Sequence, residues 1–145
     1  ITQLHRAIRM MRELKALGCR TALDDFGGGM SAFVYLRDLK IDYLKIDGNL
    51  VRDMTHDPVL YAMVESIHHV ARVMGIGTIA EWAEETPQVD ALAVIGADFA
   101  QGHAVHWPAP LADCLREVMQ TGSAARSSPP DATRARNSGP LRIVT

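Results

Sequence analysis

The sequence has little cysteine, few aromatic residues and no long apolar run. Its two cysteines, Cys19 and Cys114, lie far apart and match neither a disulfide framework nor a zinc-site spacing, so we expect a reducing cytoplasm. No stretch approaches the roughly 18 apolar residues of a membrane-spanning helix, and residues 1–14 lack the features of a signal peptide. The 145 residues are 48% apolar and 22% charged, which is typical of a soluble globular protein.

Positive charge is scarce over most of the chain. Residues 122–145 hold four arginines against one aspartate, so the first 121 residues contain 11 basic and 16 acidic side chains. This excess of acidic side chains argues against a groove for a nucleic-acid polymer and leaves carboxylates available for a metal ion. The segment 122–145 is rich in Ser, Pro, Ala and Arg, which predicts a disordered tail after a domain at 1–121. Its end, 141–145, suits a short strand, but nothing earlier predicts a partner.

Helical and strand patterns alternate along residues 1–121. We predict helices at 3–17, 31–39, 57–74, 86–95 and 110–120, and strands at 19–25, 43–47, 77–81 and 97–100. This alternation predicts a parallel α/β fold. A doubly wound sheet could be built from these elements, but polar residues at every strand end favour a (β/α)₈ barrel of the TIM type. A complete barrel needs about 250 residues, so we expect a half-barrel of about four C-terminal βα units.

Polar side chains stand at the end of every expected strand. They are Asp24, Asp25, Lys45, Asp47, Glu81 and Gln101. A buried carboxylate is costly unless it is paired or bound to metal, and a divalent cation relieves the repulsion between adjacent aspartates. Oxygen ligands suit Mg²⁺, Mn²⁺ or Ca²⁺ rather than zinc. With a lysine to orient water or meet phosphate charge, these groups suit metal-assisted phosphoester hydrolysis.

Five sequence blocks resemble the second half of an EAL domain, a family of bacterial phosphodiesterases for cyclic di-GMP. The resemblance covers about residues 1–110. The blocks are Ala22-Leu23-Asp24-Asp25-Phe26-Gly27-x-Gly29, then Asp42-Tyr43-Leu44-Lys45-Ile46-Asp47, then Ala80-Glu81-x-x-Glu84, then Gln88, and finally Gln101-Gly102 with Pro108.

The resemblance implies a role for each matching residue at a site with two Mg²⁺ or Mn²⁺ ions. Asp24 would bridge the two metals and Asp25 would bind the second. Lys45 would contact the nucleophilic water, and Glu81 would be a second-metal ligand or the general base. The substrate would be cyclic di-GMP and the product linear pGpG.

Two further roles and three departures follow from the same comparison. Glu84 would help to hold the loop after Asp25, and Gln101 would line the substrate or metal site. The family's Thr-Gly-Tyr-Ser-Ser-Leu is replaced here by residues 28–33, Gly-Gly-Met-Ser-Ala-Phe. Trp82 replaces a glycine, and Gly48 replaces an arginine.

The Glu-Ala-Leu signature and the remaining ligands of the first metal would precede Ile1. We therefore expect this fragment to be inactive by itself. The resemblance allows a homodimer and attached sensory or GGDEF domains. The alternatives are a degenerate EAL module that binds nucleotide or a protein partner without hydrolysis, and a truncated reading frame with no independent function.

Simpler interpretations also stand for the site residues. The two aspartates could cap a loop, Lys45 could extend into solvent, Glu81 could be an ordinary salt-bridge partner, and Gln101 could satisfy backbone groups. We interpret His68 and His69 as surface or partly buried residues. In an open half-barrel, inward-facing residues such as Leu23 and Ile79 would lack an opposite wall.

Overall fold

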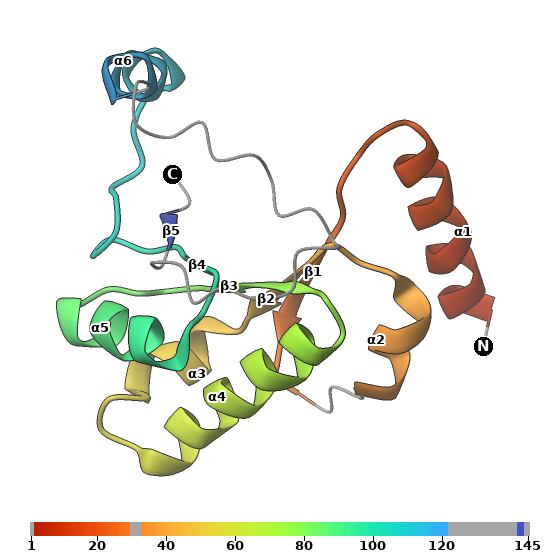
Figure 1. Cartoon of the computed structure of the whole chain (residues 1–145), viewed down its shortest axis with the longest axis horizontal. Coiled ribbons are helices and arrows are strands. Elements are labelled where there is room, and N and C mark those ends of the chain that lie inside the picture. The colour runs from red at the N-terminus through yellow and green to blue at the C-terminus, as the bar shows by residue number, and fades with distance from the viewer. Residues whose placement is uncertain (1, 30–32, 122–141, 144–145) are drawn as a thin grey trace.

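The computed structural model describes residues 2–29, 33–121 and 142–143. One parallel sheet carries the strands in the order β1-β2-β3-β4-β5, with helices in the connections between the first four (Figure 1). The elements are α1 (Thr2–Ala16), β1 (Ala22–Phe26), α2 (Phe33–Leu39), β2 (Tyr43–Ile46), α3 (Gly48–Asp53), α4 (Pro58–Val73), β3 (Gly77–Ala80), α5 (Thr86–Ile95), β4 (Phe99–Ala100), α6 (Leu111–Thr121) and β5 (Arg142–Ile143).

The strand order confirms the predicted parallel α/β fold and favours a barrel. Among the described strands, each sequence neighbour is also the spatial neighbour, so the chain advances around the sheet without reversing. A doubly wound sheet instead reverses its strand order at a switch point. Consecutive parallel strands with helical connections are the arrangement of a TIM-type barrel wall.

The two faces of the sheet have different surroundings. Leu44, Ile46, Ala80 and Ala100 are fully buried on the face that the helices cover. The opposite face carries Tyr43, Lys45, Ile79 and Phe99, which stay partly exposed. In a closed barrel this second face is the interior, where side chains from other strands fill the space.

Leu23 lies on the helix-covered face, because it pairs in register with the buried Leu44 and packs against the core. The expectation that Leu23 points inward is therefore wrong. Ile79, which pairs with Lys45, does lie on the open face.

All five predicted helices are present, and one further helix was not predicted. Asp57 caps α4 as expected, since its Oδ1 accepts the N–H groups of Val59 at 2.8 Å and Leu60 at 3.4 Å. The unpredicted helix is α3, which follows Asp47 directly. The Oδ1 of Asp47 accepts the N–H of Asn49 at 2.8 Å, so this carboxylate is a helix cap.

Strand β5 lies within the segment that the sequence predicts to be disordered. It pairs in parallel with β4, matching Phe99 with Arg142 and Ala100 with Ile143. This pairing supplies the partner that the sequence does not predict for a short strand at 141–145, because the edge of β4 offers unpaired backbone groups to a strand-forming segment. Residues 122–141 and 144–145 lie outside the described residues, so the rest of the tail stays a prediction. None of the helices in the described part of the chain is long and apolar enough to cross a membrane.

Candidate active site

Backbone hydrogen bonds continue past the carboxyl ends of the strands and position the next residue of each. Asp47 N–H donates to the carbonyl of Phe26 at 3.0 Å, and Glu81 N–H donates to that of Ile46 at 3.2 Å. The N–H of Gln101 donates in the same way to Ala80 at 2.9 Å. These three polar residues therefore start from a fixed backbone along one edge of the sheet.

An irregularity in β1 turns both aspartates toward this edge. Between Leu23 and Phe26 the register with β2 slips, so that β1 has one more residue than its partner Leu44–Ile46. Asp25 takes the left-handed conformation at this point, with φ of 54°. In a regular strand, successive side chains point to opposite faces, and a bulge re-aims one of them. The bulge thus places the Asp25 side chain beside Asp24 and keeps Phe26 on the buried face.

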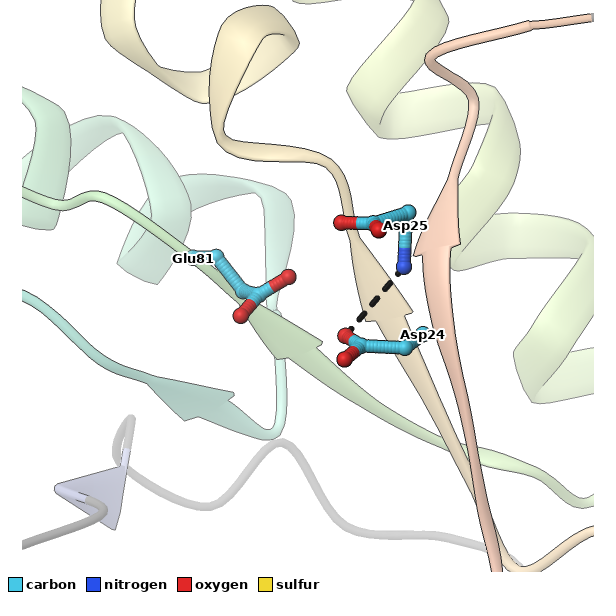
Figure 2. Close-up of side chains that lie close together, drawn as sticks. All are labelled: Asp24, Asp25 and Glu81. Atoms are coloured by element: carbon cyan, nitrogen blue, oxygen red, sulfur yellow. Dashed lines mark hydrogen bonds between the residues drawn. The ribbon is translucent and has the colours of Figure 1, made fainter.

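Three carboxylates meet at this edge. Asp24, Asp25 and Glu81 each offer an oxygen, and these oxygens lie within 4.8 Å of one another (Figure 2). The Asp25 N–H donates to Asp24 Oδ1 at 3.2 Å, which ties the two aspartates together. The Lys45 Nζ lies 2.8 Å from Asp24 Oδ1 and 2.6 Å from Glu81 Oε1. Three strands, β1, β2 and β3, therefore supply one cluster.

The charges in this cluster influence one another. A hydrogen bond from Lys45 is the largest influence on the Asp24 carboxyl, and it lowers the pKa of that group. Burial alone would lower the pKa of Lys45, but its hydrogen bonds to Asp24 and Glu81 outweigh burial and raise it. The lysine side chain is 22% exposed and that of Glu81 14%, whereas Asp24 is 62% exposed. Lys45 thus stays protonated between two carboxylates.

The donor set fits a hard divalent cation. Three carboxylates against one ammonium leave excess negative charge within the cluster, and all available ligand atoms are oxygen. Such oxygen ligands are those that Mg²⁺ and Mn²⁺ prefer. Asp24, Asp25 and Glu81 are the residues that would hold the metal, as the sequence predicts; their individual roles remain predictions.

A cavity of about 320 Å³ adjoins the carboxylates. Its lining in the described part of the chain consists of Asp25, Gly28, Asp47, Gly48, Asn49, Glu81 and Trp82. Gly28 allows the loop after β1 to approach Asp47 closely, because a Cβ at Gly28 would collide with the Asp47 carboxylate. Asp47, expected only as a strand-end polar residue, is therefore both a helix cap and part of the cavity wall.

Glu84 and Gln101 lie at the same edge but outside this lining. Glu84 Oε2 is 3.0 Å from His103 Nδ1, so the Glu84 side chain contacts the loop after β4. Its expected contact with the loop after Asp25 partly involves residues 30–32, which lie outside the described residues. Gln101 has an exposed side chain and holds the backbone of Ala83, whose N–H donates to its carbonyl at 3.0 Å. Both predicted roles stay predictions.

Two further residues, Gln88 and His103, shape the edge in ways that the sequence did not predict. Gln88 is 3% exposed; its Oε1 accepts the N–H groups of Glu84 at 2.6 Å and Glu85 at 2.9 Å, and its Nε2 donates to the Arg52 carbonyl at 2.7 Å. His103 stacks on Trp107 with ring centroids 4.0 Å apart, besides its contact with Glu84. The capping role of Gln88 could have been predicted from its position at the start of α5, three residues after Glu85.

The fold and the site together define a parallel α/β protein of barrel type with an acidic, metal-suited site at the strand ends. The sequence model of the EAL domain matches residues 1–108. The chain therefore belongs to the EAL domain family. Its sheet is part of a (β/α)₈ barrel of the TIM type.

Named relatives and solved structures agree with this family. The chain is 47% identical over 127 residues to the cyclic di-GMP phosphodiesterase PdeB of Shewanella oneidensis, covering 88% of this chain and 15% of PdeB. It is 35% identical over 118 residues to the cyclic di-GMP phosphodiesterase PdeF of Escherichia coli, covering 81% of this chain and 16% of PdeF. The EAL enzyme Bd1971, in its cAMP- and cyclic-di-GMP-bound form, is 36% identical with a TM-score of 0.71, over 77% of this chain and 30% of that one. The chain thus spans less than a third of each protein.

Proposed function

We propose that this chain is part of an EAL-type phosphodiesterase that hydrolyses cyclic di-GMP to linear pGpG by two-metal-assisted attack of water. The observation that carries the proposal is the meeting of Asp24, Asp25 and Glu81 around Lys45. PdeB and PdeF are cyclic di-GMP phosphodiesterases and Bd1971 binds cyclic di-GMP, which supports this substrate. The longer protein would supply the other ligands and any sensory or GGDEF domain. Two unpaired cysteines support a reducing cytoplasm.

The residues of this chain have separable tasks in such a reaction. Asp24, Asp25 and Glu81 would hold Mg²⁺ or Mn²⁺, which would lower the pKa of water and polarise the phosphoryl oxygens. Lys45, held between Asp24 and Glu81, would orient the attacking water and meet the negative charge that develops at phosphorus. Water would add to phosphorus and lose a proton to Glu81. The ester bond to one 3′ oxygen would break, and that oxygen would take a proton from solvent water and leave as a hydroxyl.

The test uses the full-length protein with Mn²⁺ and follows pGpG by chromatography. We expect Asp24→Asn and Asp25→Asn each to lower turnover about a hundredfold or more, because each removes a charge that would hold metal. The matched control is Asp90→Asn, which changes an exposed aspartate on α5 and should keep wild-type turnover. Wild-type rates in both site variants would contradict the metal assignment.

A non-catalytic EAL module is the second candidate, and Trp82 favours it. This bulky residue directly follows Glu81 and lines the cavity, where the family pattern has glycine. Binding of cyclic di-GMP to the full-length protein with no pGpG formed would support this second candidate over the first. Under this second candidate the ring obstructs the site, and Trp82→Gly should raise activity or nucleotide affinity. A ring that instead stacks on a nucleobase predicts the opposite, a loss of affinity.

A further inference from the structure

The indole ring of Trp82 packs directly on the backbone of Gly48. A Cβ built on Gly48 would lie 2.3 Å from both Cγ and Cδ2 of the ring, so any other residue at 48 would displace it. Two of the positions where this sequence departs from the EAL pattern beside the site are therefore in contact. The absence of a side chain at 48 makes the room that the ring at 82 occupies.

The backbone of Trp82 is held in a conformation that tryptophan rarely adopts. Its φ is 55°, in the left-handed region that favours glycine. Neighbouring contacts fix it there: the N–H of Ala83 donates to the Gln101 carbonyl at 3.0 Å, and the Ala83 carbonyl accepts the N–H of Ala104 at 2.9 Å. Strained residues that persist in this way cluster at ligand sites.

Burial of the ring does not explain this strain. Trp82 is 49% exposed, so about half of its surface gains nothing from packing in the described structure. One face rests on Gly48, and the side chain also lines the 320 Å³ cavity together with Asp25, Asp47 and Glu81. Among the described lining residues it is the only aromatic, and the others are glycine, asparagine or carboxylates. The cavity therefore combines acceptor groups with a single aromatic wall.

We propose that Trp82 is a positioning residue that stacks on one guanine base of cyclic di-GMP while Asp24, Asp25 and Glu81 face the phosphodiester. The inference rests on the proposed function and assigns the substrate contact of one residue. Aromatic side chains bind nucleobases by stacking, and carboxylate acceptors suit the N–H groups on the edge of guanine. The backbone of Gly48 supports the ring and fixes its position.

The first test compares Trp82→Leu with Trp82→Phe in the full-length protein. Affinity for cyclic di-GMP is measured by calorimetry in EDTA, where no turnover occurs. Because base stacking depends on the ring, Trp82→Leu should weaken binding about tenfold or more, and Trp82→Phe should stay within about threefold of wild type. The matched control is Trp107→Leu, another exposed tryptophan that lies outside the cavity and should keep wild-type affinity.

A second measurement separates stacking from support of the metal site. Affinity for Mn²⁺ alone should be unchanged in Trp82→Leu, because the ring is assigned to the base. If Mn²⁺ binding weakens as much as nucleotide binding, the ring shapes the carboxylate cluster and the inference is wrong. A wild-type protein that binds no cyclic di-GMP in EDTA and forms no pGpG with Mn²⁺ contradicts the proposed function itself. Wild-type binding that Trp82→Leu leaves unchanged overturns only the stacking role.

Gly48→Ala provides an independent test of the packing contact between Gly48 and the Trp82 ring. The added Cβ should push the ring aside and weaken nucleotide binding about as much as Trp82→Leu does. Adding Gly48→Ala to Trp82→Leu should cause little further loss, because neighbouring residues that act through one contact are not additive. Full affinity in Gly48→Ala, or additive losses in the double variant, would overturn the proposal.

Discussion

At the scale of single residues, Lys45 has the most specific surroundings in the candidate site. Its ammonium lies between the carboxylates of Asp24 and Glu81. Asp24 is in β1 and Glu81 directly follows β3, the two strands on either side of β2, which carries Lys45. This position leaves it at the centre of the cluster rather than in solvent, so the simpler interpretation of a side chain extending outward does not fit.

We predict that Lys45→Met in the full-length protein lowers kcat about a hundredfold and changes KM little. The reason is that a preorganised charge at the reacting centre acts mainly in the transition state. Steady-state kinetics with cyclic di-GMP provide the measurement, with Lys40→Met, which removes an exposed lysine after α2, as control. A rise in KM with unchanged kcat would assign Lys45 to substrate binding instead.

His68 belongs to a buried polar network between α4 and β3, away from the candidate site. Its Nδ1 lies 2.9 Å from Thr78 Oγ1, and that hydroxyl donates to Asp98 Oδ2 at 3.0 Å. Because the Thr78 proton points to Asp98, Nδ1 of His68 is the donor to Thr78. Burial lowers the pKa of His68; Asp98 opposes this effect, and Arg72 and His69 add to it.

The lowered pKa of His68 predicts that stability falls in mild acid. The unfolded chain takes up this proton near the ordinary histidine pKa of about 6.5, before the folded protein does. The contribution is therefore fully present above pH 6.5 and is lost as pH falls toward the folded pKa, with a slope of at most about 1.4 kcal/mol per pH unit. Urea unfolding of the full-length protein between pH 5 and 8 measures this loss of stability. His68→Gln should reduce the slope strongly, whereas His69→Gln, which removes the smallest of these influences at an exposed neighbour, should change it little. Equal slopes in all three proteins would contradict the assignment.

At the scale of elements, the sequence predicts the regular parts of the structure and misses its irregular ones. The apolar stripe and the Asp57-Pro58 start identify α4, because capping and periodicity are local signals. The bulge at Asp25 depends on how β1 pairs with β2, and no local pattern in the sequence shows it. The short helix α3 was missed because it begins with glycine and has only six residues.

The same limit applies to the site. Asp24, Asp25, Lys45 and Glu81 could be predicted together, since parallel strands bring their carboxyl ends to one edge. The contact of Trp82 with Gly48 could not, because it joins residues 34 positions apart through packing. Asp42 and Asp98, which stand just before β2 and β4, show that carboxylates at the amino ends of the strands serve to bind backbone groups. They accept the N–H groups of Thr21 and Thr78 at 2.7 and 2.8 Å.

Gln88 connects two elements and gives a prediction at this scale. Its buried amide joins the backbone after β3 to the end of α3 through three hydrogen bonds. Gln88→Ala would leave those backbone groups without partners, so we expect the free energy of unfolding to fall by about 3 kcal/mol. Urea denaturation of the variant is the measurement. Gln101→Ala, at an exposed glutamine, should change stability by less than about 0.5 kcal/mol. A similar small effect in both variants would show that water replaces the Gln88 contacts.

At the scale of the whole molecule, the described sheet is covered on one face and open on the other. Tyr43, Ile79 and Phe99 lie on the open face, where the rings of Tyr43 and Phe99 contact each other with centroids 5.7 Å apart. Helix α6 adds an exposed apolar row of Leu111, Leu115 and Met119 and stands apart from the helices of the sheet (Figure 1). Both surfaces are of the kind that a closed barrel covers.

These open surfaces predict the behaviour of residues 1–145 as an isolated polypeptide. At about 25 cal/mol per Å², a few hundred Å² of uncovered apolar surface costs roughly 5–10 kcal/mol, which is comparable with the stability of a whole domain. Strand β1 also presents an edge that no described strand covers. We therefore expect the polypeptide to be partly unfolded, aggregated, or paired with a second copy through these surfaces. Because three carboxylates would not complete a two-metal site, it should not form pGpG at a useful rate. Size-exclusion chromatography followed by an assay with Mn²⁺ tests both points, and a stable monomer with robust hydrolysis would show that the described residues alone complete the fold and the site.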